Sequence, residues 1–305
     1  MKLAHIVTIR DKAAHVEKCA RAVLAQTMPI HAVFSDQGST DGSLDIVKRI
    51  RDEYSGPHDI LILEGAPTER RGMAGLVAHL NYVHENLPDG VEYVSMTSAD
   101  DFDEPTRDER VMAAFEKHDP DFVGVRSMIA KPGYGPHAES FFPDRYSRWI
   151  AVGEAIRYGI LSACSASWSV ELWKRLAPLR GVESADFTVP MMALFGKGFY
   201  YIDEPLHTYV EHADANNTGV EGVLRAALAA NDPDEVRRIN EINEFHNCYN
   251  WTALWRRLSE SGYIGRMSSD ANQALTDRIF NRALGWAVVR ESMILDRIEP
   301  RNMLA

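Results

Sequence analysis

Short apolar runs alternate with amphipathic stretches along the first third of the chain. Runs rich in Val, Ile and Leu are bounded by turn residues and predict strands at residues 3–9, 31–36, 59–65 and 91–98. Between them, apolar positions recur with helical spacing and predict helices at residues 14–26, 43–54 and 76–87. Because parallel strands need crossovers of this length, the alternation predicts an α/β fold, a Rossmann-like mostly parallel sheet flanked by helices.

Polar loops follow two of these predicted strands. The stretch SDQGSTDGS occupies residues 35–43 after the second strand, and TSADDFDEP occupies residues 97–105 after the fourth. Loops that leave the carboxyl ends of parallel strands converge on one crevice, where ligands bind. We therefore expect both loops to face the same cleft, although Gly38, Gly42 and the good N-cap residues beside them also suit an ordinary turn.

Asp100 and Asp101 are adjacent carboxylates at a predicted strand end. Neighbouring negative charges repel each other unless a cation or solvent offsets them, and hard divalent cations prefer oxygen ligands. The alternative interpretation is an acidic turn that caps a helix from Pro105 onward. The pair alone does not decide between the two.

Composition narrows the classes of function. The chain of 305 residues has 44 acidic and 33 basic residues, and its formal net charge of −11 gives no general attraction for nucleic acid. Its cysteines, Cys19, Cys164 and Cys248, show no CxxC spacing, which argues against a disulfide framework and a cysteine zinc site and suits a reducing cytosol. No apolar run is long enough for a signal peptide or a membrane span, so we expect a soluble, cytoplasmic protein.

Four motifs in a fixed order resemble a known family. The chain shows, in this order, IVTI, AVLAQTMP, VFSDQGSTDGS and SADD. This order is similar to the nucleotide-sugar-binding half of family 2 glycosyltransferases of the GT-A fold, and the resemblance continues through residues 181–218. It implies a catalytic domain at residues 1–218, with a donor-binding half to about residue 105 and an acceptor half over 106–218, followed by a helical region at 219–305.

The resemblance implies a nucleotide-sugar donor, with a UDP-sugar favoured. In this family the loop after the second strand contacts the nucleotide, which places Asp36 and Gln37 against the base and lets Ser39 shape the turn. Further donor contacts are expected from Thr8, Ile9, Arg10, Arg71 and Asp100.

The resemblance also implies a metal-dependent transfer by an inverting, hexosyltransferase-type enzyme. Asp100 and Asp101 would hold Mn²⁺ or Mg²⁺ on the donor diphosphate, together with His212 from the late loop. The metal would stabilise the leaving diphosphate, while Asp186, at the position of the family's general base, takes the proton of an acceptor hydroxyl. Asp186 also suits a helix N-cap, since Pro190 fits near a first helical turn, and the two roles are compatible.

Aromatic residues suggest where the acceptor binds. Residues 126–153 are rich in Pro, Gly and aromatic side chains and predict a long ordered loop over the cleft. We expect Trp149 in this loop and Trp168 in the small-residue segment 159–169 to contact the acceptor, although aromatic residues at such density also pack cores.

The chain departs from the family pattern in three places. Most relatives carry Asp at the positions of Gln37 and Ser98, and the first loop has Arg10, Asp11 and Lys12 in place of a small polar or Tyr-Asn segment. Gln37 still offers a hydrogen-bond donor and an acceptor to a base. Ser98 removes a carboxylate from the metal site.

Other functions stay open on this sequence. The departures suit a non-catalytic nucleotide-sugar-binding or scaffolding protein, and a glycosyltransferase that acts on hydroxylated bases in DNA is a minor alternative. A sugar-phosphate nucleotidyltransferase suits the chain less well, because the first loop, IRDKAAH, has no glycine. Apolar positions such as Leu254 and Leu258 predict amphipathic C-terminal helices, which we expect to pack on the catalytic domain or, as a second interpretation, to form a homo-oligomer.

Overall fold

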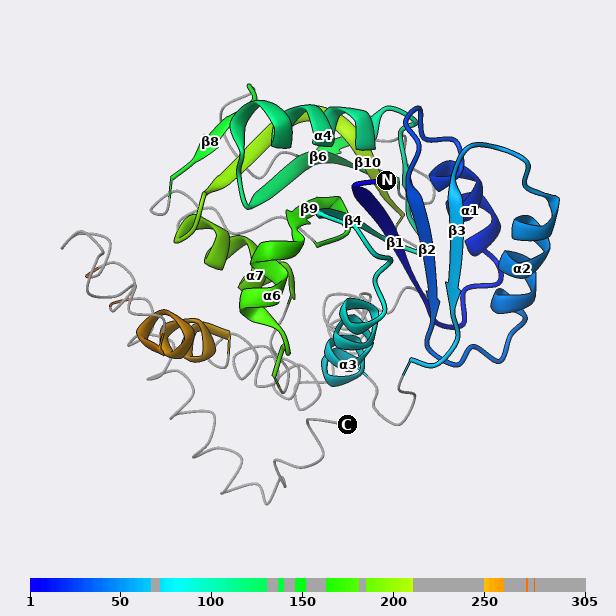
Figure 1. Ribbon diagram of the computed structural model, residues 1–305, viewed down its shortest axis with the longest axis horizontal. Coiled ribbons are helices and arrows are strands. Elements are labelled where there is room, and N and C mark those ends of the chain that lie inside the picture. The colour runs from blue at the N-terminus through cyan, green and yellow to red at the C-terminus, as the bar shows by residue number, and fades with distance from the viewer. Residues whose placement is uncertain are drawn as a thin grey trace, which may run out of the picture.

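The first four strands form a parallel group, as the alternation predicts (Figure 1). A computed structural model describes residues 1–66, 72–130, 137–139, 146–151, 163–180, 185–210, 250–260, 273 and 277. The four strands are β1 (Leu3–Ile9), β2 (His31–Asp36), β3 (Asp59–Leu63) and β4 (Tyr93–Ser98). β1 lies between β2 and β4, with Thr8 opposite Ser35 on one side and Ser98 on the other. The carboxyl ends of these three strands therefore lie side by side.

Later strands continue the same sheet in a different order. They are β5 (Phe102–Asp103), β6 (Phe122–Ala130), β7 (His137–Glu139), β8 (Arg148–Ile150), β9 (Ala166–Ser169) and β10 (Phe199–Val210). The order across the sheet is β3-β2-β1-β4-β9-β6-β10-β5. Only β9 interrupts the parallel direction between β4 and β6, since it runs antiparallel to both, and β10 runs parallel to β6. The predicted α/β fold is confirmed, with a mostly parallel central sheet.

The prediction of a long loop at residues 126–153 is wrong for the residues of this range that the structure describes. β6 extends to Ala130, β7 pairs antiparallel with β6, and β8 pairs antiparallel with β10. The partner of β8 lies some 50 residues away in the sequence, so local composition gives no sign of the pairing. These strands widen the sheet beside β6 and β10.

Helices cover both faces of the sheet. α1 (Val16–Val23), α2 (Ser43–Glu53) and α4 (Arg107–His118) pack on one face, and α3 (Gly72–Glu85), α6 (Val170–Leu176) and α7 (Ala185–Leu194) pack on the other (Figure 1). Each strand contributes side chains to the cores on both faces of the sheet, because successive side chains point to opposite faces. In β1, Ala4 and Ile6 join the core under α3, whereas Leu3 and Val7 join the core under α1.

Residues 250–260 form a helix that packs on the α7 side. Leu254 and Leu258 are fully buried, and the ring of Trp251 meets that of Phe187 at 4.7 Å between centroids. Apart from this helix and residues 273 and 277, the helical region predicted at 219–305 lies outside the described residues.

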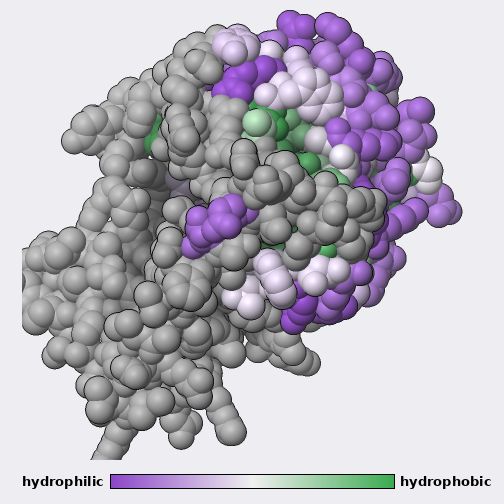
Figure 2. All heavy atoms as spheres, turned by 90° about the vertical axis from the view of Figure 1, so that its left-hand side faces the viewer, coloured by the Kyte–Doolittle hydropathy of each residue, from purple (hydrophilic) through white to green (hydrophobic). Residues whose placement is uncertain are grey.

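The surface of the described residues is mainly hydrophilic in the view of Figure 2, and apolar side chains show only in small areas between polar ones. No helix in the described part of the chain is both long enough and apolar enough to cross a membrane.

Candidate active site

The short polar side chains of residues 35–43 hold the loop that follows β1. Three backbone N–H groups of the first loop donate to side chains of the second: Asp11 to Ser39 Oγ at 2.9 Å, Lys12 to Ser43 Oγ at 2.7 Å and Ala13 to Asp41 Oδ2 at 2.8 Å. One hydrogen bond runs in the other direction, from the backbone N–H of Thr40 in the second loop to Oδ1 of Asp11 in the first, at 2.8 Å. The two loops therefore form one interlocked unit at the carboxyl edge of the sheet.

Asp36 ends β2 with one carboxylate oxygen in use and one unpartnered. Its Oδ2 accepts from the N–H groups of Gly38 at 2.9 Å and Ser39 at 3.0 Å, and Gly38 supplies the positive φ of 71° that this turn needs. Its Oδ1 is buried and has no hydrogen-bond partner among the described residues. Because a buried acceptor without a partner is costly, Oδ1 is suited to accept a hydrogen bond from a ligand.

Gln37 does not present its amide to a ligand as predicted. Its Nε2 donates to the carbonyl of Gly75 at 2.9 Å, and its Oε1 accepts from Arg10 Nη1 at 3.2 Å. The side chain, 4% exposed, thus ties α3 to the first loop and positions Arg10.

Thr8 and Ile9 act through their backbones. The carbonyl of Thr8 accepts from Ala99 N at 3.1 Å, and that of Ile9 accepts from Gln37 N at 2.9 Å, so β1 is bonded to the loops on both sides. The side chain of Ile9 lies in the core and is not available to a donor.

The two carboxylates after β4 have different surroundings. Asp100 forms an ion pair with Lys12, with 2.6 Å between Nζ and Oδ2. Asp101 accepts a hydrogen bond at Oδ1 from Val210 N at 2.9 Å. Its Oδ2 is buried, has no hydrogen-bond partner within the described ranges, and lies 3.7 Å from His207 Nε2. Burial, together with the neighbouring charge of Asp100, raises the pKa of Asp101 well above its usual value.

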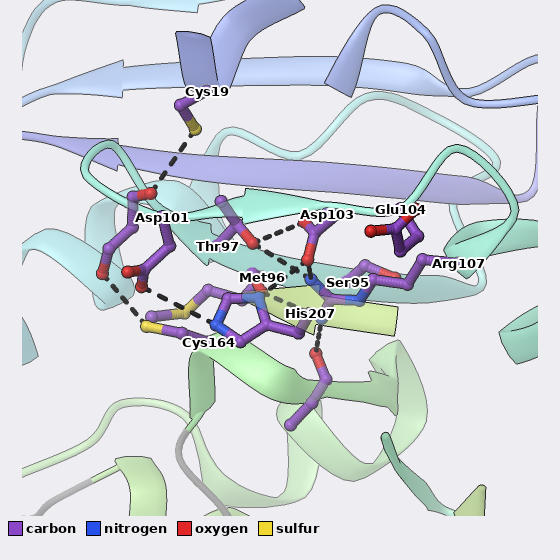
Figure 3. Close-up of polar contacts among 12 residues, drawn as sticks. Cys19, Ser95, Met96, Thr97, Asp101, Asp103, Glu104, Arg107, Cys164 and His207 are labelled. Atoms are coloured by element: carbon purple, nitrogen blue, oxygen red, sulfur yellow. Dashed lines mark hydrogen bonds and ion pairs between the residues drawn. The ribbon is translucent and has the colours of Figure 1, made fainter. Parts of the chain in front are cut away.

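A buried charge network lies beneath this loop (Figure 3). Asp103 pairs with the fully buried guanidinium of Arg107 and accepts a hydrogen bond from Thr97 Oγ1 at 2.6 Å. Its Oδ1 also lies 2.7 Å from His207 Nδ1. Burial alone would raise the pKa of Asp103, but Arg107 and His207 hold it well below its usual range. The network fixes the chain on both sides of Asp101, and no local pattern in the sequence indicated it.

Ser98 has neutral partners at the position where most relatives carry a carboxylate. Its Oγ lies 3.0 Å from Cys164 Sγ, and its carbonyl accepts from Cys19 Sγ at 3.4 Å. Both cysteines are buried, and neither forms a disulfide. The acidic motif therefore consists of Asp100 and Asp101 alone.

These two residues fit half of a divalent-cation site. Their oxygens are the hard ligands that Mn²⁺ and Mg²⁺ prefer, and the unpartnered Oδ2 of Asp101 is the kind of atom that a cation satisfies. Among the described residues, no group of three or more His, Cys, Asp or Glu side chains could hold a metal. The remaining ligands would have to come from a diphosphate, from water or from His212, which lies outside the described residues, as does Arg71.

Asp186 lies in the first turn of α7. Residues 195–198 alone separate α7 from β10, so the helix runs back along the sheet and its N-terminal turn lies toward the carboxyl edge, where the loops of Asp36 and Asp100 are. Pro190 lies within α7, one turn later than the sequence suggested, and proline has no N–H to donate to the carbonyl one turn earlier in the helix.

The two tryptophans predicted to bind the acceptor do not fit that role. Trp168 is 1% exposed and packs edge-to-face on Trp173 at 5.4 Å, so its ring belongs to the core. Trp149 is 45% exposed, but it lies opposite Tyr200, at the start of β10. This is the amino edge of the sheet, away from the loops of Asp36 and Asp100.

The fold and the paired loops define an α/β protein of the GT-A type. A family model described as glycosyl transferase family 2 matches residues 5–163, about half of the chain. The protein belongs to this family, as the motif order predicted.

Solved structures with a similar fold share little sequence. Staphylococcus aureus TarS, residues 1–349, in complex with UDP-GlcNAc, is 15% identical with a TM-score of 0.56, covering 92% of this chain and 80% of TarS. The mannosyltransferase PcManGT from Pyrobaculum calidifontis, in complex with GDP-Man and Mn²⁺, is 18% identical with a TM-score of 0.54, covering 98% of this chain and 88% of PcManGT. No curated protein sequence matches the chain.

Proposed function

We propose that the protein is a metal-dependent, inverting glycosyltransferase that moves a sugar from a nucleoside-diphosphate sugar to an acceptor hydroxyl. The observation that carries this proposal is a pair of buried carboxylate oxygens, Asp36 Oδ1 and Asp101 Oδ2, that have no hydrogen-bond partner in the described part of the chain. Asp36 is the last residue of β2 and Asp101 lies just after β4, and these two strands flank β1 in the sheet. Asp36 Oδ1 is suited to accept from an N–H or O–H group of a nucleoside, and Asp101 Oδ2 is suited to a cation. A nucleoside-diphosphate sugar presents both needs, because its nucleoside carries such donors and its diphosphate binds a cation.

The chain's own residues then divide the work. Asp36 orients the nucleoside, and Asp100 with Asp101 would hold Mn²⁺ or Mg²⁺, which would offset the negative charge of the diphosphate. Asp186 takes the proton from the acceptor hydroxyl while the hydroxyl oxygen bonds to the anomeric carbon of the sugar. The bond to the diphosphate breaks on the opposite face of the sugar, so the anomeric configuration inverts.

We favour a UDP-sugar as the donor. The TarS structure contains UDP-GlcNAc, while the PcManGT structure contains GDP-Man, so both nucleotides are sensible probes. A non-catalytic nucleotide-sugar-binding role is the second candidate, because Lys12 holds Asp100 and Ser98 replaces a third carboxylate.

The first experiment is thermal unfolding of the protein with UDP, GDP and their sugar conjugates, with and without Mn²⁺. A ligand at about 100 times its Kd adds about 2.7 kcal/mol to the stability of the folded state. We expect stabilisation by one nucleotide family that Mn²⁺ increases, and the increase should disappear in Asp100→Asn. No stabilisation by any nucleotide, with or without metal, would overturn the proposal.

Turnover separates the two candidates. With the stabilising nucleotide sugar, release of the free nucleoside diphosphate in the presence of candidate hydroxyl acceptors should require Mn²⁺. Binding of the donor without any turnover, across acceptors and with water as the acceptor, would favour the non-catalytic role.

A further inference from the structure

Lys12 places a buried cation inside the candidate donor site. Its backbone is fixed on both sides, because its N–H donates to Ser43 Oγ at 2.7 Å and its carbonyl accepts from His15 N at 2.9 Å and Val16 N at 2.8 Å. Its side chain is only 9% exposed and ends on Asp100. The backbone anchors the residue at the start of α1, while the four-carbon stem leaves the ammonium group free to change partner.

Asp100 Oδ2 cannot keep its ion pair with Lys12 and bind a metal ion at the same time. Nζ lies 2.6 Å from Oδ2, the distance of a charge-assisted hydrogen bond, and the carboxylate is 13% exposed. An ammonium group and a divalent cation repel each other and compete for the same oxygen. A cation that binds Oδ2 therefore displaces Nζ, which must find another anion, because an unpaired and poorly solvated charge is costly.

The nearest new anion in a loaded site would be the diphosphate of the donor. It is the group that the metal itself holds, and phosphate oxygens accept hydrogen bonds from lysine. The departures of this chain from the family pattern agree with such an exchange. Ser98 removes one negative charge beside Asp100, and Lys12 adds one positive charge. The site is therefore less negative than one with a third carboxylate would be, which favours the binding of a phosphate.

We infer that Lys12 is a diphosphate-binding residue, which holds Asp100 in the free protein and turns to a phosphate oxygen of the donor when Asp100 is needed by the metal. This inference rests on the proposed function. It explains the charged first loop as part of the donor site, and it predicts that metal and Lys12 compete in the free protein but act together on a nucleoside diphosphate.

A purely structural role is the alternative. The ion pair joins the loop after β1 to the loop after β4, and its loss could simply loosen both. The two roles differ in one respect: a loosened site binds every part of the nucleotide less well, whereas a lost phosphate ligand leaves binding of the nucleoside unchanged.

The experiment compares the wild type with Lys12→Met and Lys12→Arg by calorimetric titration of UDP and uridine, or of GDP and guanosine if GDP is the nucleotide that binds. Lys48→Met is the matched control, since Lys48 pairs with Glu64 at 2.9 Å on the exposed surface of α2. Binding of Mn²⁺ alone, followed by electron paramagnetic resonance, provides a readout that does not depend on turnover.

For Lys12→Met we expect the affinity for the diphosphate to fall roughly tenfold or more, because a charge-assisted hydrogen bond is lost. Uridine affinity should stay within about twofold of the wild type, a change of less than 0.5 kcal/mol. Mn²⁺ alone should bind more tightly, because Asp100 is released. Lys12→Arg should keep most of the diphosphate affinity, and Lys48→Met should match the wild type throughout.

Two results would overturn the inference. An unchanged diphosphate affinity in Lys12→Met would show that Lys12 does not bind phosphate, and an equal loss for uridine and UDP would show a structural role. A wild type that binds no nucleotide at all is a different result, which would overturn the proposed function and this inference with it.

Discussion

The side-chain amide of Asn81 brackets the backbone of Leu179. Nδ2 donates to the carbonyl of Leu179 at 2.9 Å, and Oδ1 accepts from its N–H at 2.8 Å. Asn81 belongs to α3, and Leu179 lies in the segment that leads from α6 toward α7. The pair therefore fixes the chain after α6, which leads toward Asp186, against α3.

Replacing Asn81 with Ala should lower the free energy of unfolding by about 1–3 kcal/mol, because both backbone groups of Leu179 lose their partner in a partly buried place. We also expect a lower kcat with little change in donor affinity, since the segment before Asp186 is released. Urea denaturation and steady-state kinetics measure the two effects. Asn86→Ala is the control: Asn86 lies just after α3, is exposed, and its side-chain amide donates to the carbonyl of Tyr82, within the same helix region. Equal effects in the two variants would contradict the prediction.

Asp36→Asn should separate stability from nucleotide binding. The amide oxygen can still accept from Gly38 and Ser39, so the turn should survive and the free energy of unfolding should stay within about 1 kcal/mol of the wild type. The NH₂ group then replaces Oδ1 and offers a donor where an acceptor stood. Nucleoside affinity, measured by calorimetry, should fall roughly tenfold or more. Asp45→Asn, on the exposed side of the first turn of α2, is the control, and wild-type affinity in Asp36→Asn would contradict the assignment.

Asp186→Asn should lose turnover and keep donor binding. An amide cannot take the acceptor proton, and a positioned general base contributes roughly 10²–10⁴-fold to the rate. Removing one negative charge near the N-terminus of α7 should cost stability only about 0.3–1 kcal/mol. Initial rates and calorimetric donor affinity test this, with Glu171→Gln in the first turn of α6 as the control. A variant that turns over at the wild-type rate would show that another group is the base.

Local sequence signals predicted the elements of the first 100 residues well. β2 spans His31–Asp36 as predicted, and α2 ends one residue before the predicted end, because apolar periodicity and turn residues determine such elements locally. The polar stretch at residues 35–43 was also placed at the correct edge of the sheet. Its detailed role was not predictable, since the hydrogen bonds it makes reach a loop that lies about 28 residues earlier in the chain.

The arrangement of the strands after β4 depends on contacts that the sequence does not display. β9 lies between β4 and β6 through antiparallel pairings with strands distant in sequence, and Trp168 is buried because Trp173 of α6 packs against it. Arg107 and Asp103 look like ordinary surface charges in the sequence. They are buried because β5, α4 and β10 bring their charges together, so each charge is satisfied only in the complete fold.

His5 should make the stability of the protein depend on alkaline pH. Its ring is fully buried in β1, with Nδ1 2.7 Å from Asp108 Oδ2 and Nε2 3.1 Å from Asp103 Oδ2. Burial by itself would lower the pKa of His5, but these two carboxylates outweigh it and raise the pKa to about 9. Arg107 and His207 also belong to this network and both contact Asp103, while Asp101 lies 3.7 Å from His207.

Because the pKa of His5 is higher in the folded state than its unfolded value of about 6.5, the protonated ring stabilises the fold fully below that pH. The stabilisation, on the order of 3 kcal/mol, is lost as the pH rises through about 9. Urea denaturation at pH 6, 8 and 9.5 should show this decline, and His5→Gln should be less stable at pH 6 and show a shallower decline. Asp108→Asn removes the strongest stabilising charge and should move the decline to lower pH. A decline of equal steepness in the wild type and His5→Gln would mean that another group causes it.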